Sequence, residues 1–205
     1  MPTVAGPRAG GTRHLSKGQS DHQQDTTVNS ADDQRPPHLA TIGLGSNLGD
    51  REATLREAIL WLGAQRGNQL RSCSSLYETE PFGKADQGWF LNCVIRIETS
   101  RDLQGFFHGL QEGEDRFGRV RRERWGPRTL DLDLLFFDDA VYSDAELTVP
   151  HPGVAVRRFV LEPLCEVAPD LVHPSLGQRA SVLLGQLTET SRVVCLGRPP
   201  VLEPY

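Results

Sequence analysis

The chain has 205 residues and a formal net charge of -5 at pH 7. A chain of this length allows one domain with tails, because domains typically contain about 100–200 residues. The acidic balance argues against general affinity for nucleic acid, which usually requires a basic domain. We therefore expect a small-molecule ligand and no nucleic-acid partner.

The cysteines indicate neither a zinc site nor a disulfide framework. All four are scattered, without Cys-x-x-Cys spacing or a histidine-linked pattern: Cys73, Cys93, Cys165 and Cys195. No apolar run approaches the ~18 residues of a membrane span, and the first residues lack the apolar core of a secretory signal. We expect a reduced, cytoplasmic monomer with no membrane partner.

The N-terminal segment over 1–37 has almost no large apolar side chain. It is rich in Gly, Ser, Thr, Gln, Asp and Pro, and such a composition cannot offset the entropy lost on ordering. Its acidic residues are untypical of an organelle-targeting peptide. We predict a disordered extension over 1–37, a folded domain over 38–196 and a C-terminal tail over 197–205.

The domain begins with a strand, a glycine-containing turn and a helix. The strand is expected at 38–44, and the turn over 43–49 ends at Asp50, a residue type preferred at helix N-caps. Apolar residues at helical spacing predict the helix over 51–65. The turn lacks the Gly-Lys-Ser/Thr ending of a Walker A phosphate loop, and a lone glycine turn is a weak signal. A tight strand-to-helix connection near the site is the favoured interpretation, with a phosphate loop as the alternative.

Two strands follow, expected at 69–78 and 89–98, with an irregular segment over 79–88 between them. Asn92 is an amide among the apolar residues of the later strand. It is either an ordinary exposed position or a group that recognises the planar donor and acceptor edge of a ligand.

The second half of the chain predicts a helix over 103–115, with Asp102 as its N-cap, and a strand over 130–137. Three shorter elements are expected after it: a helix over 159–167 with Pro163 in its first turn, a helix over 180–187 and an edge strand over 192–196. The order strand, helix, strand, strand, helix, strand is the ferredoxin-like, split βαβ pattern. We therefore predict an α+β fold with a mainly antiparallel sheet and helices packed on one face, which leaves the other face for polar strand residues.

The strand over 130–137 has an inverted alternation, with leucines on one face and Asp131 and Asp133 on the other. Asp is depleted in strands, and like charges on one face repel each other. The two Cα atoms would lie ~7 Å apart at ~3.3–3.4 Å per residue, so both carboxylates could bind one Mg²⁺ ion or a pair of ions. The alternative is an ordinary solvent-exposed strand face.

An arginine-dense segment leads directly into this strand. It surrounds Trp125-Gly126-Pro127 and contains Arg116, Arg119, Arg121, Arg122, Arg124 and Arg128. Alone, such a run is usually a solvated surface or a weak nucleic-acid patch. Beside paired carboxylates it indicates a polyanion whose charge is shared between guanidinium groups and metal, and a nucleoside triphosphate is the commonest such ligand.

Six motifs occur in order along the chain: Ile42 to Asp50, Ser75 to Thr79, Phe90-Leu91-Asn92, Gly118 to Arg121, Arg124 to Asp133, and Val149-Pro150-His151-Pro152. Together they resemble the 6-hydroxymethyl-7,8-dihydropterin pyrophosphokinase family of folate biosynthesis, over roughly residues 38 to 175. The resemblance implies an enzyme that transfers pyrophosphate from ATP to the hydroxymethyl group of the pterin and releases AMP. It also implies two Mg²⁺ ions as cofactors.

The resemblance further implies a role for individual residues. Catalytic residues would be Arg119, Arg121, Arg128, Asp131 and Asp133, with the two aspartates as metal ligands. Nucleotide-binding residues would be Glu114, Trp125, Thr148, His151 and Arg157. Pterin-binding residues would be Thr79, Glu80, Phe82, Phe90, Asn92 and Phe159, with the phenylalanines at 90 and 159 sandwiching the ring.

An RNA-binding or nucleotide-binding module on a ferredoxin-like sheet is the competing hypothesis. The acidic balance, the missing aromatic pattern of RNA-binding strands and a carboxylate pair that would repel phosphates without metal all count against it. Thermal stabilisation by Mg²⁺ with a non-hydrolysable ATP, rather than by RNA alone, would discriminate the two.

Overall fold

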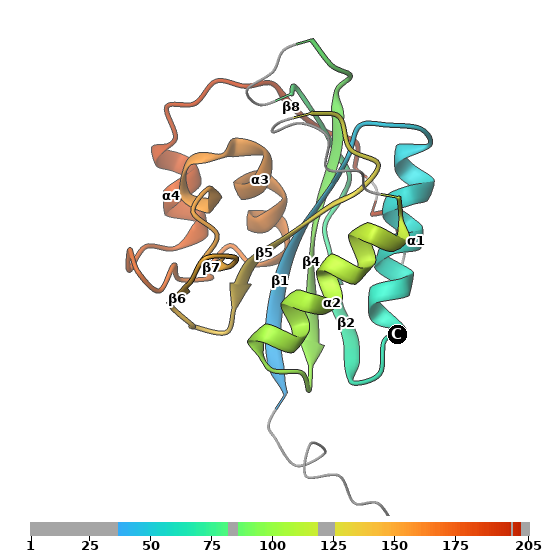
Figure 1. Ribbon diagram of the computed structural model, residues 1–205. Helices are drawn as coiled ribbons and strands as arrows, with labels where there is room; N and C mark the ends of the chain where they lie inside the picture. The colour runs from blue at the N-terminus through green and yellow to red at the C-terminus, as the bar shows by residue number, and fades with distance from the viewer. Residues whose placement is uncertain (1–36, 82–85, 119–125, 198, 202–205) are drawn as a thin grey trace, which may run out of the picture. The chain divides into compact units, whose positions relative to one another are not determined.

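The computed structural model describes residues 37–81, 86–118, 126–197 and 199–201, and these fold around an antiparallel sheet. The strands and helices that build and flank the central layer are β1 (His38–Ser46), α1 (Arg51–Gly63), β2 (Asn68–Cys73), β3 (Tyr77–Thr79), β4 (Phe90–Thr99), α2 (Leu103–Arg116) and β5 (Asp131–Phe137). The remaining elements are β6 (Tyr142–Ser143), β7 (Thr148–Val149), η2 (Val154–Val156), α3 (Arg158–Val167), α4 (Ala180–Gln186) and β8 (Val193–Cys195). The main sheet has the order β5-β1-β4-β3-β8, with β2 also paired to β4 (Figure 1).

The predicted split βαβ order is confirmed, although one predicted strand is broken in two. Both β2 and β3 pair antiparallel with the same edge of β4. Ser74 lies in the break between them, where its amide donates to the Val94 carbonyl and its hydroxyl accepts from the Val94 amide, each at 2.9 Å. The strand therefore leaves regular pairing without leaving the backbone groups of β4 unsatisfied.

The first two helices cover one face of the sheet, as the sequence predicts (Figure 1). Leu55 and Ile59 of α1 and Leu110 of α2 are almost fully buried against the strands. Asp50 and Asp102 are the N-caps of these helices, and their carboxylates accept from the amides three residues later at 3.0 and 2.8 Å. The predicted caps are confirmed.

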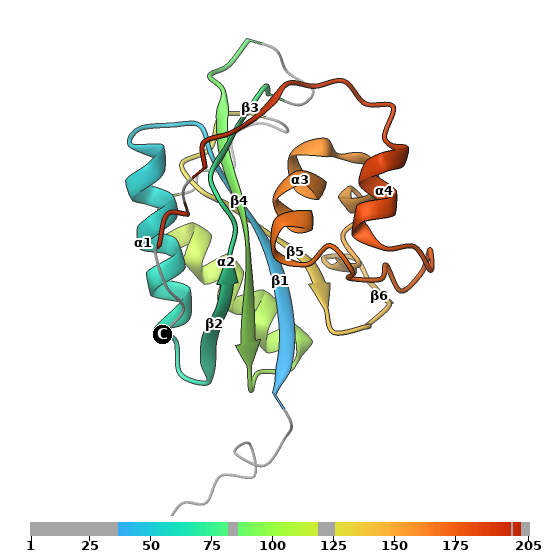
Figure 2. The same cartoon turned by 180° about the vertical axis from the view of Figure 1, so that it is seen from behind.

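The last two helices lie on the opposite face, so helices are not confined to one side of the sheet (Figure 2). The reason is a second apolar area, in which Val94, Leu135 and Phe136 are buried against α3 and α4. Because these helices cover only part of that face, polar strand residues on the rest of it line a pocket.

Two local predictions need correction. β1 continues through Gly45 to Ser46 instead of ending at residue 44, so the glycine-containing segment begins inside the strand. Pro163 lies inside α3 rather than in its first turn, because the helix begins at Arg158. The predicted edge strand over 192–196 is confirmed as β8, which pairs with β3.

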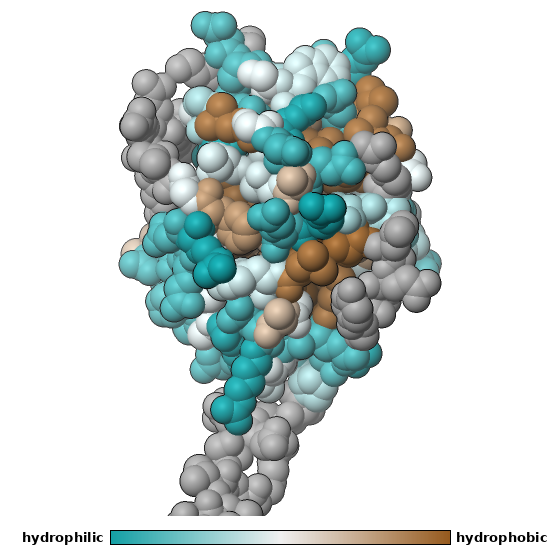
Figure 3. Space-filling view, turned by 90° about the vertical axis from the view of Figure 1, so that its right-hand side faces the viewer, coloured by the Kyte–Doolittle hydropathy of each residue, from teal (hydrophilic) through white to brown (hydrophobic). Residues whose placement is uncertain are grey.

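The predicted extension over 1–37 lies, except for its last residue, outside the described residues. Within the described part of the chain, no helix is both long and apolar enough to cross a lipid bilayer. The surface on the α1 side mixes hydrophilic and hydrophobic side chains (Figure 3).

Candidate functional site

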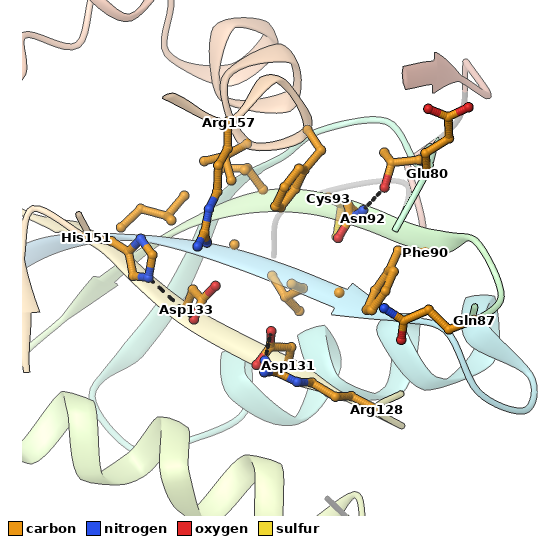
Figure 4. Close-up of a pocket in the computed structure, with 18 of the residues that line it drawn as sticks. Glu80, Gln87, Phe90, Asn92, Cys93, Arg128, Asp131, Asp133, His151 and Arg157 are labelled. Atoms are coloured by element: carbon orange, nitrogen blue, oxygen red, sulfur yellow. Dashed lines mark hydrogen bonds and ion pairs between the residues drawn. The ribbon is translucent and has the colours of Figure 1, made fainter. Parts of the chain in front are cut away.

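A pocket of about 340 Å³ opens over three neighbouring strands, β5, β1 and β4 (Figure 4). The strand register brings its polar residues together, because Gly45 is paired with Asp131 on one side and Asn92 on the other. Two residues earlier on β1, and therefore on the same face of the sheet, Gly43 is paired with Asp133. The two carboxylates and the amide therefore lie on one face of the sheet, as the alternation predicts.

Gly43 and Gly45 form the floor of the pocket between these side chains. Of the two, only Gly45 has neighbouring atoms that leave no room for a side chain. A Cβ atom at Gly45 would lie 2.7 Å from Oδ1 of Asn92, closer than real Cβ contacts. A Cβ at Gly43 would meet the Leu135 side chain at an ordinary 3.5 Å. Gly45 therefore leaves the space in which the Asn92 amide is held.

The carboxylate pair is met by a positive charge from the segment before β5. The guanidinium of Arg128 forms an ion pair with Asp131, and both side chains are largely shielded from solvent. Asp133 faces His151, whose Nε2 lies 4.0 Å from Oδ1 of the carboxylate (Figure 4). Among the residues that the structure describes, no group of three His, Cys, Asp or Glu side chains is placed to hold a metal.

His151 is neutral at physiological pH. Burial and the nearby charge of Arg157 lower the pKa of His151 to about 4, and Asp131 opposes this shift only in part. Its Nδ1 accepts from the Gly153 amide at 3.0 Å, so the proton of the neutral ring lies on Nε2. The ring thus presents an N–H group toward the carboxylate side of the pocket.

The other end of the pocket is aromatic and contains the buried amide. Phe90 and Phe159 both line it, together with Thr79 and Glu80. Nδ2 of Asn92 donates to Oγ1 of Thr79 at 2.7 Å, and this bond fixes the orientation of the amide. The Arg157 guanidinium lies 5.8 Å from the centre of the Phe159 ring.

The segment after β1 braces the site, in agreement with its interpretation as a connection near the site. Asn47 accepts from the Arg128 amide at 2.7 Å and donates its own amide to the Arg128 carbonyl at 3.1 Å. Its Nδ2 also donates to the Gln87 side chain at 3.2 Å and the Gly88 carbonyl at 3.3 Å. Asn47 therefore ties the start of β5 to the loop before β4.

Sequence reasoning missed Gly43, Gly45 and Gln87, which line the pocket, and Asn47, which holds two of its segments together. The signal for the glycines was present, since glycine at alternate positions of a central strand marks close approach of other groups. No pattern distinguishes Asn47 from an ordinary turn residue, because its partners lie 40 or more residues away in the chain.

The structure brings together most, but not all, of the predicted site residues. Those lining the pocket are Thr79, Glu80, Phe90, Asn92, Arg128, Asp131, Asp133, His151, Arg157 and Phe159. Those outside the described residues are Phe82, Arg119, Arg121 and Trp125.

Two predicted nucleotide-binding residues do not line this pocket. Glu114 is 4% exposed, and its Oε1 accepts from the Leu132 amide of β5 at 2.9 Å. Thr148 lies in β7, where its hydroxyl is 3.0 Å from that of Ser143. Glu114 thus contacts the backbone between the two aspartates, whereas Thr148 belongs to the small β6–β7 sheet.

Comparison with known proteins identifies close relatives. The family model for 7,8-dihydro-6-hydroxymethylpterin-pyrophosphokinase matches residues 41–169. The 2-amino-4-hydroxy-6-hydroxymethyldihydropteridine pyrophosphokinase of Methylorubrum extorquens is 45% identical over 133 residues, which are 65% of this chain and 84% of the relative. The protein of the same name from Synechocystis is 39% identical over 164 residues, 80% of this chain and 84% of the relative.

Solved structures agree in fold. A crystal structure of Plasmodium falciparum HPPK-DHPS matches 75% of this chain with a TM-score of 0.60 at 15% identity. This chain spans 46% of the length of that protein, so the likeness concerns one part of a longer chain.

Proposed function

Because the chain belongs to the 7,8-dihydro-6-hydroxymethylpterin-pyrophosphokinase family, and is thus a transferase of folate biosynthesis, we propose that the pocket over β5, β1 and β4 is where this reaction takes place. In that reaction pyrophosphate passes from ATP to the hydroxymethyl group of the pterin, and AMP is released. The observation that carries the proposal is the strand register. The register brings Asn92, Asp131 and Asp133 into one cavity, which supports a ring-binding end beside a phosphate-binding end.

The carboxylate pair fits Mg²⁺ bound together with a substrate. Mg²⁺ prefers oxygen ligands and usually takes one or two carboxylates plus phosphate oxygens, rather than a complete protein cage. Asp131 and Asp133 provide two such carboxylates on one face, and the described residues add no third ligand beside them. Two Mg²⁺ ions held there would neutralise charge on the triphosphate and on the departing AMP.

The residues around the carboxylates bind and orient the triphosphate. Arg128 neutralises phosphate charge, and Asn47 holds its backbone in place. His151 donates from Nε2 without adding charge, and Arg157 supplies a further cation at the cavity wall. We assign Arg119, Arg121 and Trp125 to the same end from the family resemblance alone.

Glu114 and Thr148 enter the proposal differently. Since the Glu114 carboxylate holds the backbone of β5 at Leu132, it positions the two aspartates rather than touching the nucleotide. Thr148 precedes the extended segment that carries His151 and acts by placing that segment.

The aromatic end binds the pterin. Phe90 and Phe159 stack on the planar ring, while the Asn92 amide reads its donor and acceptor edge and so fixes its orientation. Thr79 and Glu80 line the same wall, and Phe82 is assigned there by resemblance. This arrangement presents the hydroxymethyl group toward the carboxylate end.

Catalysis then consists of alignment and charge stabilisation. The hydroxymethyl oxygen attacks the β-phosphorus in line with the oxygen that bridges to the α-phosphate. The new oxygen–phosphorus bond forms as the bridging bond breaks, and AMP leaves with the bridging oxygen. The protein contributes the in-line geometry, and either a carboxylate of the aspartate pair or a water accepts the proton of the hydroxyl.

The test is to incubate the protein with ATP, Mg²⁺ and 6-hydroxymethyl-7,8-dihydropterin and to identify the nucleotide product. AMP is expected, and formation of ADP would exclude pyrophosphate transfer. Asp133→Ala should reduce turnover by about a thousandfold with an unchanged far-ultraviolet circular dichroism spectrum. Near-normal turnover of this variant would contradict the metal assignment.

We also propose that residues 38–196 form the catalytic domain and that the protein acts as a cytoplasmic monomer. Residues 1–37 and 197–205 are then an extension and a tail that the reaction does not need. Size-exclusion chromatography with light scattering tests the monomer, and a dimer mass would refute it.

A further inference from the structure

The segment from Glu189 to Cys195, here termed the C-terminal strap, lies beyond residues 41–169 that match the family model. After α4 it crosses the end of the sheet and reaches β3 (Figure 2). None of the predicted site residues belongs to it, yet it contacts both walls of the aromatic end of the pocket.

The first anchor joins the strap to the wall formed by α3. Oε2 of Glu189 accepts from the Arg158 amide at 3.0 Å, and the Glu189 carbonyl accepts from Nε of Arg158 at 3.3 Å. Arg158 is the first residue of α3, and the preceding Arg157 makes no side-chain cap. The Glu189 carboxylate therefore caps this helix from a distant part of the chain, at the end where negative charge is favourable. Phe159, which lines the pocket, is the next residue of the helix.

The carboxylate is itself held in place within the strap. Its Oε1 accepts from the Ser191 amide at 2.7 Å. Desolvation raises the pKa of Glu189, but the bonds from Ser191 and Arg158 outweigh it and lower that pKa overall. The cap is thus a charged group in the folded protein at neutral pH.

The second anchor joins the strap to the opposite wall. The Glu80 amide donates to the Arg192 carbonyl, and the Arg192 amide donates to Oε2 of Glu80, each at 3.1 Å. Thr79 is paired with Val193 in the β3–β8 ladder. The Arg192 guanidinium also lies 5.7 Å from the centre of the Trp89 ring, next to Phe90 in the chain.

We propose that the C-terminal strap is a positioning element for pterin binding, because it joins the Thr79–Glu80 wall to the Phe159 wall and so sets the gap in which the ring is sandwiched. This inference rests on the proposed function. If the gap between the two walls is fixed before the pterin binds, less conformational entropy of the protein is lost on binding. The strap should therefore increase the affinity for the pterin. Both anchors lie at the aromatic end of the pocket, whereas Arg128, Asp131 and His151 lie at its carboxylate end, so the strap should affect ATP much less.

The experiment breaks each anchor separately in the full-length protein. Glu189→Ala removes the cap on α3, and Arg192→Pro removes the amide that donates to Glu80. Either change should raise the KM for 6-hydroxymethyl-7,8-dihydropterin about tenfold, the effect of one lost hydrogen bond to a charged group, and leave the KM for ATP within about twofold. Glu189→Gln keeps an acceptor of the same size and should restore most of the affinity.

The control variant is Asp170→Ala, which removes an exposed ion pair with Arg179 away from the pocket. It should leave both KM values unchanged. Thermal unfolding of every variant separates loss of fold from loss of positioning, since a merely structural role would lower the Tm and raise both KM values together.

The possible results separate failure of the strap assignment from failure of the proposed function. If the wild-type protein forms AMP but both strap variants keep a normal pterin KM, the strap assignment is wrong and the function stands. An equal rise of both KM values would also overturn the assignment. If the wild-type protein forms no AMP, the proposed function fails and the strap assignment fails with it.

Discussion

Replacing Gly45 by alanine tests whether the absence of a side chain at this position makes room for the Asn92 amide. The added Cβ would lie 2.7 Å from Oδ1 of Asn92, at least 0.7 Å short of the 3.4 Å at which ordinary contact begins. The backbone of β1 is paired on both sides, so the amide must move instead. Movement breaks the 2.7 Å bond from Asn92 to Thr79 and misaligns the group that reads the pterin edge.

The size of the effect follows from that lost bond. Leaving a buried amide without its partner costs about 1–3 kcal/mol, which corresponds to roughly a 5- to 150-fold weaker affinity. We therefore expect the Gly45→Ala variant to raise the pterin KM within this range. The KM for ATP should change little, because the clash is at the aromatic end of the pocket.

Gly43→Ala is the matched control, on the same strand and the same face. Its Cβ meets Leu135 at 3.5 Å, an ordinary contact, so pterin affinity should be retained. Steady-state kinetics with each substrate varied in turn, together with thermal unfolding, measures both variants. Equal pterin KM values for the two variants would refute the argument that Gly45 makes room for Asn92.

Three further predictions concern other contacts. Thr79→Val keeps the shape but removes the acceptor for Asn92, so the pterin KM should rise about tenfold, whereas Thr79→Ser should restore it. Asn47→Ala releases the backbone of Arg128 and should lower kcat/KM for ATP by about 10- to 100-fold; an unchanged value would refute the brace. Burial lowers the pKa of His173 below 6.5, so the unfolded chain binds its proton first and stability falls as the pH drops below 6.5. The Tm measured at several pH values should fall less at low pH for His173→Asn than for the wild type. An identical fall in both proteins would show that His173 does not cause it.

The core of the fold could be predicted from periodicity because its interactions are local. Helical spacing in α1 and α2, and the N-caps at Asp50 and Asp102, were all readable within one or two turns of chain. The placement of α3 and α4 could not be predicted in this way. It depends on which face of the sheet has an apolar area that α1 and α2 do not cover. That area appears only when the register brings Val94 beside Leu135 and Phe136.

The same distinction applies to the site. The aspartates of β5 were visible because charge at alternate strand positions contradicts strand propensity. The brace at Asn47 and the cap by Glu189 were invisible, since each is a bond between segments distant in the chain.

A sequence specifies its fold when local preferences agree with it, and disagreement marks function. β1 carries glycines and β5 carries aspartates at paired positions, and both residue types are poor choices for a sheet. The sheet tolerates them because one face of those strands is packed by α1 and α2, while Arg128 pairs with Asp131 and His151 faces Asp133 on the other. The packed face therefore stabilises the fold, and the part of the opposite face that α3 and α4 leave uncovered can carry the polar residues of the pocket. Asp133→Ala on the pocket face should consequently lower kcat with little loss of Tm, whereas Ile59→Ala on α1 should lower stability by about 2–5 kcal/mol with substrate affinities intact.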